Sequence, residues 1–188
     1  MKKIGIMSCM LFAIAISAQA QNKPATSVKK EVYQATATKT HDLVHTELDA
    51  SFDFNNAWLL GKVKLTLHPH HYPTSNLVLD AKGMDVKEVA IVKNGKNTPL
   101  KFTNDGMTLN VQLDKNYVKN ENYTVFISYT AKPNDYKGTG SAAITDAKGL
   151  YFINPTGTDK NKPTQVWTQG ETEGTSVWVP TIDKPNQK

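Results

Sequence analysis

The sequence predicts an all-β protein, folded as an antiparallel β-sandwich or open barrel. Three observations lead to this prediction. Apolar and polar residues alternate with a period of two in several segments, no long helical pattern interrupts them, and turn dipeptides such as Asn94-Gly95 and Asp105-Gly106 recur between them. Short strands separated by turn signals at about ten-residue spacing are typical of sandwiches and barrels. With 188 residues, the chain has room for one such domain and a terminal segment.

Residues 1–20 are typical of a cleavable signal peptide rather than of a folded element. Two lysines precede the short apolar stretch 4–16, and Ala18-Gln19-Ala20 provides the small residues that cleavage requires. We therefore expect cleavage after Ala20 and a periplasmic or secreted product. Cys9, the only cysteine, would be lost with this peptide, so the mature chain must fold without a disulfide. No later stretch is apolar enough to predict a membrane span in the mature chain.

The folded domain is expected to span residues 39–188. The preceding residues 21–38 are rich in Lys, Thr, Ala and Gln without periodicity, which predicts a flexible leader. Over residues 44–54 the even positions are mostly apolar and the odd positions polar or charged, which predicts a half-buried strand. The pattern resumes over residues 59–67 after the turn dipeptide Asn55-Asn56. These two strands therefore predict a long hairpin.

The same reasoning predicts further short strands along the rest of the chain. Residues 134–148 are rich in Gly, Ala and Asp and predict a loop between two of them. The segments expected to form strands are 77–79, 86–92, 100–102, 107–113, 123–131 and 149–153.

The charge pattern argues against a nucleic-acid-binding protein. The formal net charge is +5 at pH 7, but the lysines are scattered along the chain. A nucleic-acid interface requires a basic stripe or patch, and the sequence contains neither. We expect no nucleic-acid partner.

Two histidine motifs resemble metal-binding patterns, but neither predicts a metal site. His41 and His45 have the spacing of a zincin helix, yet they lie at the start of a predicted strand, where they would stand roughly 13 Å apart. His68, His70 and His71 form a denser cluster with no Cys, Asp or Glu close by in sequence, so the ligand set is incomplete. We expect neither a bound metal nor a catalytic residue in this chain, and the role of this cluster stays open.

Segment 164–186 contains the residues that point to a function. Gln169 and Glu171 stand two residues apart, after a predicted apolar strand at Val166 and Trp167. On an extended segment, the Gln169 and Glu171 side chains would face the same way. A carboxylate and a carboxamide beside aromatic residues suit a ligand with an amine head group, and a solvated strand end is the alternative interpretation.

The spacing in this segment resembles the end of the N-terminal domain in the aminopeptidase N family, which are zinc aminopeptidases of the gluzincin type. Thr168-Gln169-x-Glu171 and Pro180-x-x-Asp183-x-Pro185 fit without a gap. The chain departs from many members at Thr175-Ser176, where they have Ala-Arg, and at Lys184, where they have Glu. Over residues 39–186, other features also resemble the saddle-shaped β-domain of this family: Asp42…His45…Leu48…Phe52, Leu60-Gly61, Leu79-Asp80-Ala81-Lys82, Ile127-Ser128-Tyr129 and Gly149-Leu150-Tyr151-Phe152.

The resemblance implies the substrate-recognition part of an exported zinc aminopeptidase. In that family the Zn²⁺ ligands and the general base belong to a following thermolysin-like domain, so we expect this chain to be a catalytically incomplete fragment of a longer enzyme. The implied role of Glu171, with Gln169 beside it, is to contact the free α-amino group of a peptide substrate. The implied partners are that peptide and the catalytic domain. A stand-alone β-sandwich that binds peptide or glycan without catalysis, and a purely structural domain, are the alternatives.

Overall fold

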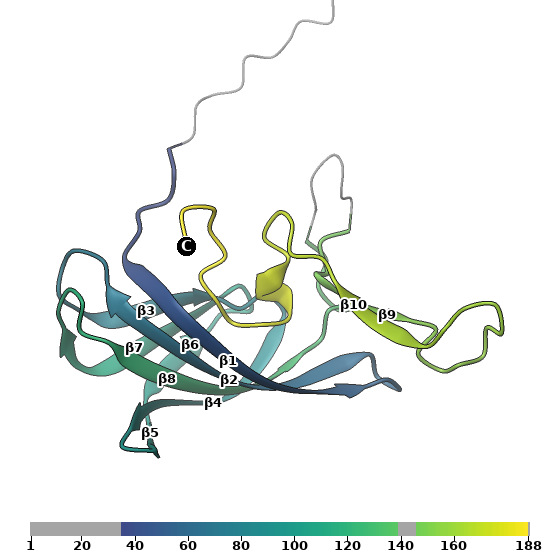
Figure 1. Cartoon of the computed structure of the whole chain (residues 1–188), viewed down its shortest axis with the longest axis horizontal. Coiled ribbons are helices and arrows are strands. Elements are labelled where there is room, and N and C mark those ends of the chain that lie inside the picture. Colours follow the sequence, from purple (N-terminus) through teal and green to yellow (C-terminus); the bar gives the residue numbers. More distant parts are fainter. Residues whose placement is uncertain (1–34, 139–145, 188) are drawn as a thin grey trace, which may run out of the picture. The chain divides into compact units, whose positions relative to one another are not determined.

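The computed structural model describes residues 35–138 and 146–187, and residues 36–188 form one compact unit. The predicted signal peptide and all but the last few residues of the predicted leader lie outside the described residues. Regular structure in the described part is almost entirely strand (Figure 1). The elements are β1 (His41–Asp53), β2 (Trp58–Pro69), β3 (Thr74–Asp80), β4 (Met84–Lys93), β5 (Lys96–Pro99), β6 (Lys101–Asn104), β7 (Thr108–Tyr117), β8 (Tyr123–Ala131), β9 (Leu150–Ile153), β10 (Gln165–Thr168) and the short 3₁₀ helix η1 (Thr175–Val177).

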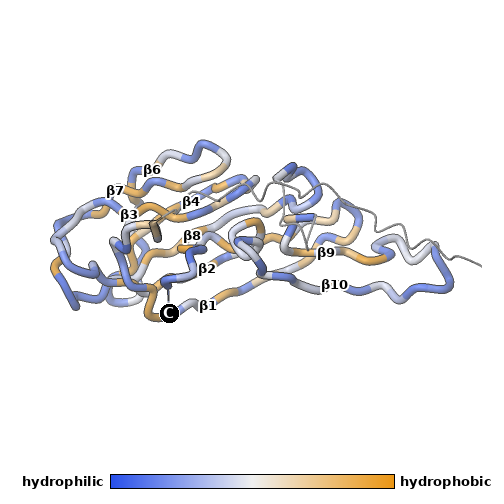
Figure 2. The backbone as a smooth tube through the Cα atoms, turned by 90° about the horizontal axis from the view of Figure 1, so that it is seen from above, coloured by the Kyte–Doolittle hydropathy of each residue, from blue (hydrophilic) through white to orange (hydrophobic). Residues whose placement is uncertain are grey.

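The strands form three antiparallel sheets. The order is β1-β2-β8-β4-β5 in the largest sheet, β3-β7-β6 in the second, and β10-β9 in a two-stranded ribbon. The first two sheets share one hydrophobic core, and β4 of the large sheet lies nearest to β6 and β7. Figure 2 shows the apolar residues concentrated on the strands and the polar residues in the connecting loops. The predicted all-β antiparallel fold is confirmed, with open sheets rather than a closed barrel.

The β1–β2 hairpin is confirmed, but the predicted half-burial of β1 is wrong. Leu48 pairs with Val63 and Phe52 with Leu59, so these pairs share one face of the sheet. Val63 and Leu59 are fully buried, whereas Leu48 and Phe52 are 36% and 43% exposed. The reason is position, because β1 is an edge strand and the three-stranded sheet lies over β4 instead.

The remaining predicted strands are present, and one further strand was missed. Strand β5 is exposed along its whole length and has no apolar alternation, so nothing in its sequence distinguishes it from a loop. It forms because Asn94 and Gly95, at φ of 50° and 74°, make the tight turn that folds it back onto β4. At the other turn dipeptide, Asp105 accepts hydrogen bonds from the backbone of Met107 and Thr108, which fixes the β6–β7 turn.

Tyr129 links the core to the C-terminal segment. Its ring is buried and packs directly on Gly61, where a Cβ atom would collide with it. Its hydroxyl donates to the carbonyl oxygen of Trp178 at 2.9 Å. The segment that carries the candidate site is thereby tied to the centre of the large sheet. Among the described residues, the structure contains no helix with the length and hydropathy of a membrane span.

Candidate functional site

The C-terminal segment crosses from the β9–β10 ribbon to the edge of β3. After β10 the chain makes a turn, forms η1, and then pairs Thr181 with Asp80 through hydrogen bonds of 2.7 and 3.0 Å between their backbones. Figure 1 shows this path in yellow. Near the end of the segment, Asn186 donates to the carbonyl of Ala37 at 2.9 Å, so the segment is held at both ends.

Gln169 and Glu171 lie at the start of this turn, and the predicted extended geometry is wrong for Glu171. The Gln169 N–H donates to the Gly149 carbonyl at 2.8 Å, which continues the β9–β10 ladder by one residue. Glu171 lies in the turn itself, and its N–H donates to the Gln169 side-chain oxygen at 3.1 Å. Gln169 is partly buried, and Glu171 is exposed. The structure therefore brings the two residues together through a hydrogen bond rather than by strand alternation.

Three glycines allow the turn to pack closely against the start of β9. The Gly174 N–H donates to the Gly170 carbonyl at 3.0 Å and closes the turn. Gly149 has a φ of 69°, and a Cβ atom there would collide with the Gly174 carbonyl oxygen. A Cβ atom on Gly174 would lie 2.6 Å from the Gln169 carbonyl oxygen. The geometry of the turn thus depends on missing side chains.

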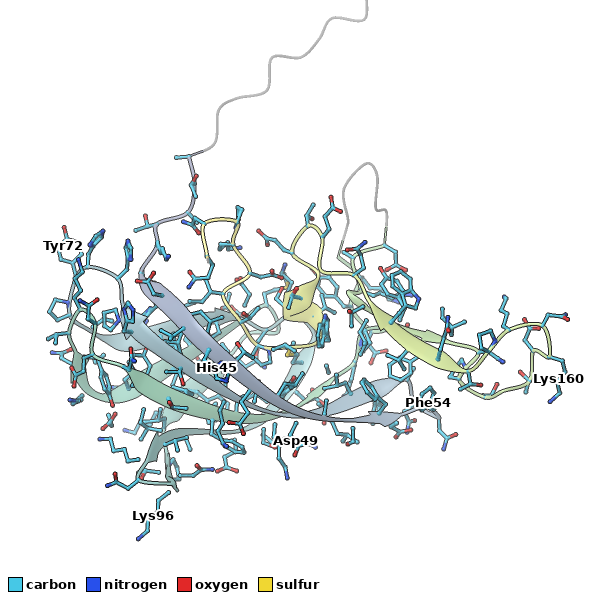
Figure 3. The ribbon with its side chains drawn as sticks, viewed as in Figure 1. His45, Asp49, Phe54, Tyr72, Lys96 and Lys160 are labelled. Atoms are coloured by element: carbon cyan, nitrogen blue, oxygen red, sulfur yellow. The ribbon has the colours of Figure 1, made fainter. Side chains whose placement is uncertain are left out.

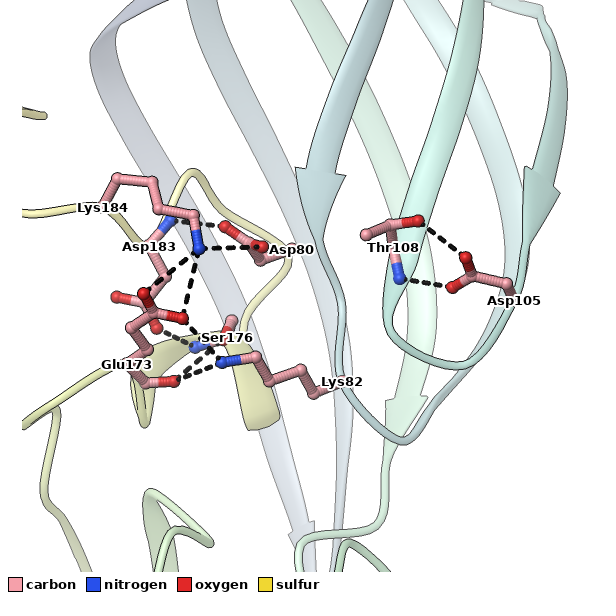
Figure 4. A network of polar contacts seen from close by, with 8 residues as sticks. All are labelled: Asp80, Lys82, Asp105, Thr108, Glu173, Ser176, Asp183 and Lys184. Atoms are coloured by element: carbon pink, nitrogen blue, oxygen red, sulfur yellow. Dashed lines mark hydrogen bonds and ion pairs between the residues drawn. The ribbon is translucent and has the colours of Figure 1, made fainter. Parts of the chain in front are cut away.

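An ion-pair network holds the far end of the turn (Figure 4). Glu173 accepts hydrogen bonds from Lys82 at 3.2 Å and from Lys184 at 3.1 Å, and Lys184 also lies 3.7 Å from Asp80. Partial burial disfavours the charged form of Glu173, but the hydrogen bonds from Lys184 and Lys82 outweigh it and lower the pKa of Glu173. Lys184 stands where many members of the resembling family have Glu, and here Glu173 supplies its opposite charge.

Backbone contacts in the same region add to the network. The Asp80 carboxylate accepts from the Asp183 N–H at 2.9 Å, and the Asp183 carboxylate accepts from the Ser176 N–H at 2.8 Å. Lys82 also donates to the Glu173 carbonyl at 3.2 Å. The charged side chains of Asp80, Asp183 and Lys82 therefore hold the backbone of the C-terminal segment in place. In the described part of the chain, the ion pairs here involve Glu173 and Asp80 and leave out Glu171.

The histidines occupy two different environments at the other end of β1 and β2. His41 is buried at 2% exposure, whereas His45 is exposed (Figure 3). The carboxylate of Asp42 lies 2.7 Å from His70 Nδ1, 3.6 Å from His68 Nδ1 and 2.6 Å from Lys39 Nζ. The sequence spacing did not predict that Asp42 is the common contact of these three side chains. Within residues 35–138 and 146–187, no group of three His, Cys, Asp or Glu side chains is arranged to hold a metal ion.

Tyr151 was missed as the residue that stacks on Trp167 in the ribbon. Tyr151 and Trp167 are cross-strand partners, and their rings stack at 4.4 Å with an interplanar angle of 12°. On the other face of the ribbon, Phe152 packs edge-on against Phe52 and Phe54 of the β1–β2 hairpin, the latter labelled in Figure 3. Trp167 remains 45% exposed.

Comparison with known proteins identifies the family of this chain and solved structures of similar fold. The family model described as the peptidase M1 N-terminal domain matches residues 29–188. The M1 zinc metallopeptidase from Deinococcus radiodurans has a similar fold, with a TM-score of 0.63 and 20% sequence identity over 83% of this chain and 32% of that one. The yeast leukotriene A4 hydrolase, in its complex with bestatin, has a TM-score of 0.57 and 25% identity over 86% of this chain and 24% of that one. This chain thus spans a third or less of these structures, and no curated protein sequence matches it.

Proposed function

Because this chain belongs to the family of peptidase M1 N-terminal domains, we propose that it is the substrate-recognition domain of an exported zinc aminopeptidase. In this proposal Glu171 pairs with the free α-ammonium group of a peptide, and Gln169 holds the turn that presents Glu171. The parent enzyme removes N-terminal residues, and this chain supplies recognition without the hydrolytic groups.

The observation that carries the proposal is the separation of charges in the turn. Glu173 is neutralised by Lys82 and Lys184, whereas the Glu171 carboxylate takes part in none of the ion pairs of the described residues. An ammonium group that approaches the turn therefore meets one uncompensated carboxylate. A charge-assisted hydrogen bond between the two groups would distinguish a free N-terminus from a blocked one.

We assign zinc to a part of the parent outside this chain. The described residues do not fit a zinc site, because they provide no three-membered ligand group. Zinc would polarise the scissile carbonyl in the parent.

The exposed face of β1 supports a longer parent. Leu48 and Phe52 are 36% and 43% exposed on the face of the sheet that is buried one strand further in, and Val44 of the same strand is 52% exposed. Apolar surface of this kind is commonly covered in a larger protein. A following domain is the expected cover, and it would place other side chains around Glu171 as well.

The first test is the mass of the protein exported by its source cells. We expect a polypeptide that begins at Gln21, because Ala18-Gln19-Ala20 follows an apolar stretch. We also expect it to extend beyond Lys188. A mature protein that ends at Lys188 would contradict the enzymatic proposal, and one that retains Cys9 would contradict the signal peptide.

The second test is Glu171→Ala in that parent enzyme. Glu171 is exposed in this chain, so its effect depends on being covered by substrate and by the following domain. A covered charge pair that loses one partner typically costs about 2–5 kcal/mol, which lowers kcat/KM by roughly 30-fold to a few thousand-fold. Glu171→Gln should lose less, because the amide keeps a hydrogen-bond acceptor.

Two controls make this test specific. Glu47→Ala removes another exposed carboxylate, paired with Lys64 on the hairpin, and should leave kcat/KM within about twofold. An N-acetylated peptide lacks the ammonium group and should be a poor substrate of the unmodified enzyme. If Glu171→Ala behaves like Glu47→Ala, amine recognition by this turn is wrong.

A further inference from the structure

The outer face of the β3-β7-β6 sheet carries a groove that the proposed function does not use. One hollow of about 360 Å³ lies between residues 38–40 and the start of β3, and its lining includes His71, Tyr72 and Val78. A second hollow of about 210 Å³ lies over all three strands of this sheet. Asn76 lines both hollows, so they form one continuous groove. The first hollow alone is within the size range of small-ligand sites.

Carboxamide side chains form the floor of the groove. Asn76 pairs with Gln112 and Val78 pairs with Asn110 across β3 and β7. Leu77, which lies between Asn76 and Val78, is fully buried, so its two neighbours face away from the core. Adjacent side chains on one face of a sheet lie about 5 Å apart. Three carboxamides are therefore within reach of one ligand.

These carboxamides retain hydrogen-bonding groups for a ligand. The backbone of Asn76 is bonded to the Thr74 hydroxyl at 3.0 and 3.1 Å, and its side chain is exposed. Asn110 donates to the Thr108 hydroxyl at 3.3 Å, which uses one of its two N–H donors, and Gln112 is exposed. A carboxamide donates and accepts at the same time, so each one suits a pair of adjacent hydroxyl groups.

An exposed tyrosine stands at one end of the groove. Tyr72, labelled in Figure 3, is 83% exposed. His71 lies edge-on to it at a ring distance of 6.4 Å, His70 lies 4.0 Å from His71, and the Asp42 carboxylate lies 2.7 Å from His70 Nδ1. The histidines thus link Tyr72 to the β1–β2 hairpin. Since the ring of Tyr72 buries little surface in the fold, a ligand that covers it gains apolar burial.

The groove is close to neutral. Lys39 at its edge is compensated by Asp42 at 2.6 Å, and among the described residues no Asp or Glu lines either hollow. Lys101 lines the second hollow. A nucleic acid would require a row of basic side chains rather than one, and a cationic ligand would require carboxylates. The groove therefore favours a ligand that is uncharged and rich in hydroxyl groups.

We propose that this groove binds a neutral oligosaccharide. A pyranose ring carries C–H groups on its faces and hydroxyl groups on its edges, so one sugar unit stacks on Tyr72 while the next units bond the carboxamides of Asn76, Asn110 and Gln112. An extended peptide adds to the edge of a sheet, where backbone groups are free, whereas this groove crosses a face on which the backbone is already paired. The inference is independent of the amine site, because the groove uses no residue of the turn after β10.

The test uses the 188-residue chain and five neutral hexasaccharides as probes: cellohexaose, maltohexaose, laminarihexaose, mannohexaose and N-acetylchitohexaose. Dissociation constants are measured by NMR, from the ring signals of Tyr72 and the side-chain amides of Asn76, Asn110 and Gln112. One stacked ring and a few hydrogen bonds predict a constant of about 0.1–1 mM for at least one probe. Hexagalacturonate and N-acetyl-hexaalanine amide, an acidic sugar and a neutral peptide, should bind more weakly.

Five variants locate the binding. Tyr72→Ala should weaken it about 10-fold, whereas Tyr72→Phe should keep most of the affinity because the ring remains. Asn76→Ala and Gln112→Ala should each weaken it about 2- to 10-fold. Asn97→Ala is the matched control, since it removes an exposed carboxamide from β5 of the other sheet and should change no constant. Unchanged signals from the β2–β8 core confirm that each variant is folded.

The outcomes are decisive for the groove alone. If none of the hexasaccharides shifts a signal, or if binding survives both Tyr72→Ala and Asn76→Ala, the proposal is overturned. Tighter binding of hexagalacturonate or of the peptide than of every neutral sugar overturns the ligand class. Glu171→Ala should leave sugar binding unchanged, so failure of the groove and failure of the amine site are distinguishable.

Discussion

His41 is a buried side chain that should make the stability of the fold sensitive to acid. Its ring packs edge-on against Tyr123 at 6.1 Å, its Nδ1 lies 3.1 Å from the Thr40 hydroxyl, and its Nε2 is buried with no partner in the described part of the chain. Burial lowers the pKa of His41 to about 4, against an opposing effect of the neighbouring Asp42 charge and a reinforcing one of His68. The folded protein therefore keeps this imidazole neutral where the unfolded chain takes up a proton.

The sign of the pH effect follows from that difference. Above the ordinary histidine pKa of about 6.5 neither state is protonated at this position, and as pH falls toward 4 only the unfolded state gains the proton. As the pH falls from 7 to 5, His41 should thus lower the free energy of unfolding by about 2 kcal/mol. Urea unfolding of His41→Phe at the two pH values should show a smaller loss than the wild type by this amount. His45→Gln changes an exposed histidine of the same strand and should leave this loss of stability as in the wild type. If His41→Phe does not alter the pH dependence of stability, His41 is not its source.

At the scale of elements, the turn after β10 depends on Gly149 more than on any contact that its own side chains make. Gly149→Ala combines a left-handed backbone conformation with a collision against the Gly174 carbonyl, and it also brings a Cβ atom within 3.1 Å of the Trp178 ring. The turn must move, since the opposing atom is backbone. We expect a loss of about 2–4 kcal/mol in stability and faster hydrogen exchange at the Gly174 amide.

Gly157→Ala is a closely matched control for this prediction. Gly157 has a φ of 67°, similar to the 69° of Gly149, but the nearest atom to its added Cβ would be the Thr164 hydroxyl at 3.6 Å. This variant incurs only the backbone cost of about 1–2 kcal/mol. The difference between the two losses measures the packing of the turn on β9. Equal losses would mean that the turn adapts without strain.

The elements also show which parts of the fold and site were predictable from the sequence. Period-two alternation located β2, β7 and β8, because each is buried on one face and its sequence records that burial. The same pattern in β1 led to a wrong prediction of half-burial. Alternation indicates which face of a strand is apolar, but it does not indicate whether another sheet covers that face. Strand β5 carries no alternation at all, and the turn before it decides its pairing.

For the candidate site, the sequence supports a prediction of the segment but not of its geometry. The spacing of Gln169 and Glu171 identified the functional residues to propose, but their arrangement depends on Gly149, which is distant in sequence. Likewise, Lys82 meets Glu173 and Asp42 meets His70 across 91 and 28 residues, and only the folded sheets bring them together. Lys184 in place of an expected Glu was the one local difference in charge, and in the fold it pairs with Glu173.

At the scale of the whole molecule, the chain is a β-sandwich, and the turn after β10 carries Glu171, which takes part in none of the ion pairs of the described residues. In the proposed function, such a domain contributes recognition and another part of the parent contributes the cleavage. Among the described residues, the group most similar to a set of metal ligands is Asp42 with His68 and His70. In this group, His68 Nδ1 lies 3.6 Å from the Asp42 carboxylate and 3.1 Å from the Pro69 carbonyl. The Nδ1 atom of His70 lies 2.7 Å from the same carboxylate, so both histidines contact Asp42.

We therefore expect the purified 188-residue chain to bind zinc no more tightly than scattered surface histidines do and to leave aminoacyl substrates intact. Three ligands in tetrahedral geometry are the minimum of a catalytic zinc site, and no such group exists among the described residues. Elemental analysis after dialysis, and release of a chromophore from an aminoacyl anilide with and without added zinc, are the measurements.

A His68→Gln, His70→Gln double variant is the control for adventitious binding at that cluster. One zinc ion per chain at micromolar affinity, or turnover that a chelator abolishes, would contradict the assignment of catalysis to another part of the parent. Loss of that zinc in the double variant would then move the metal site to the Asp42 cluster.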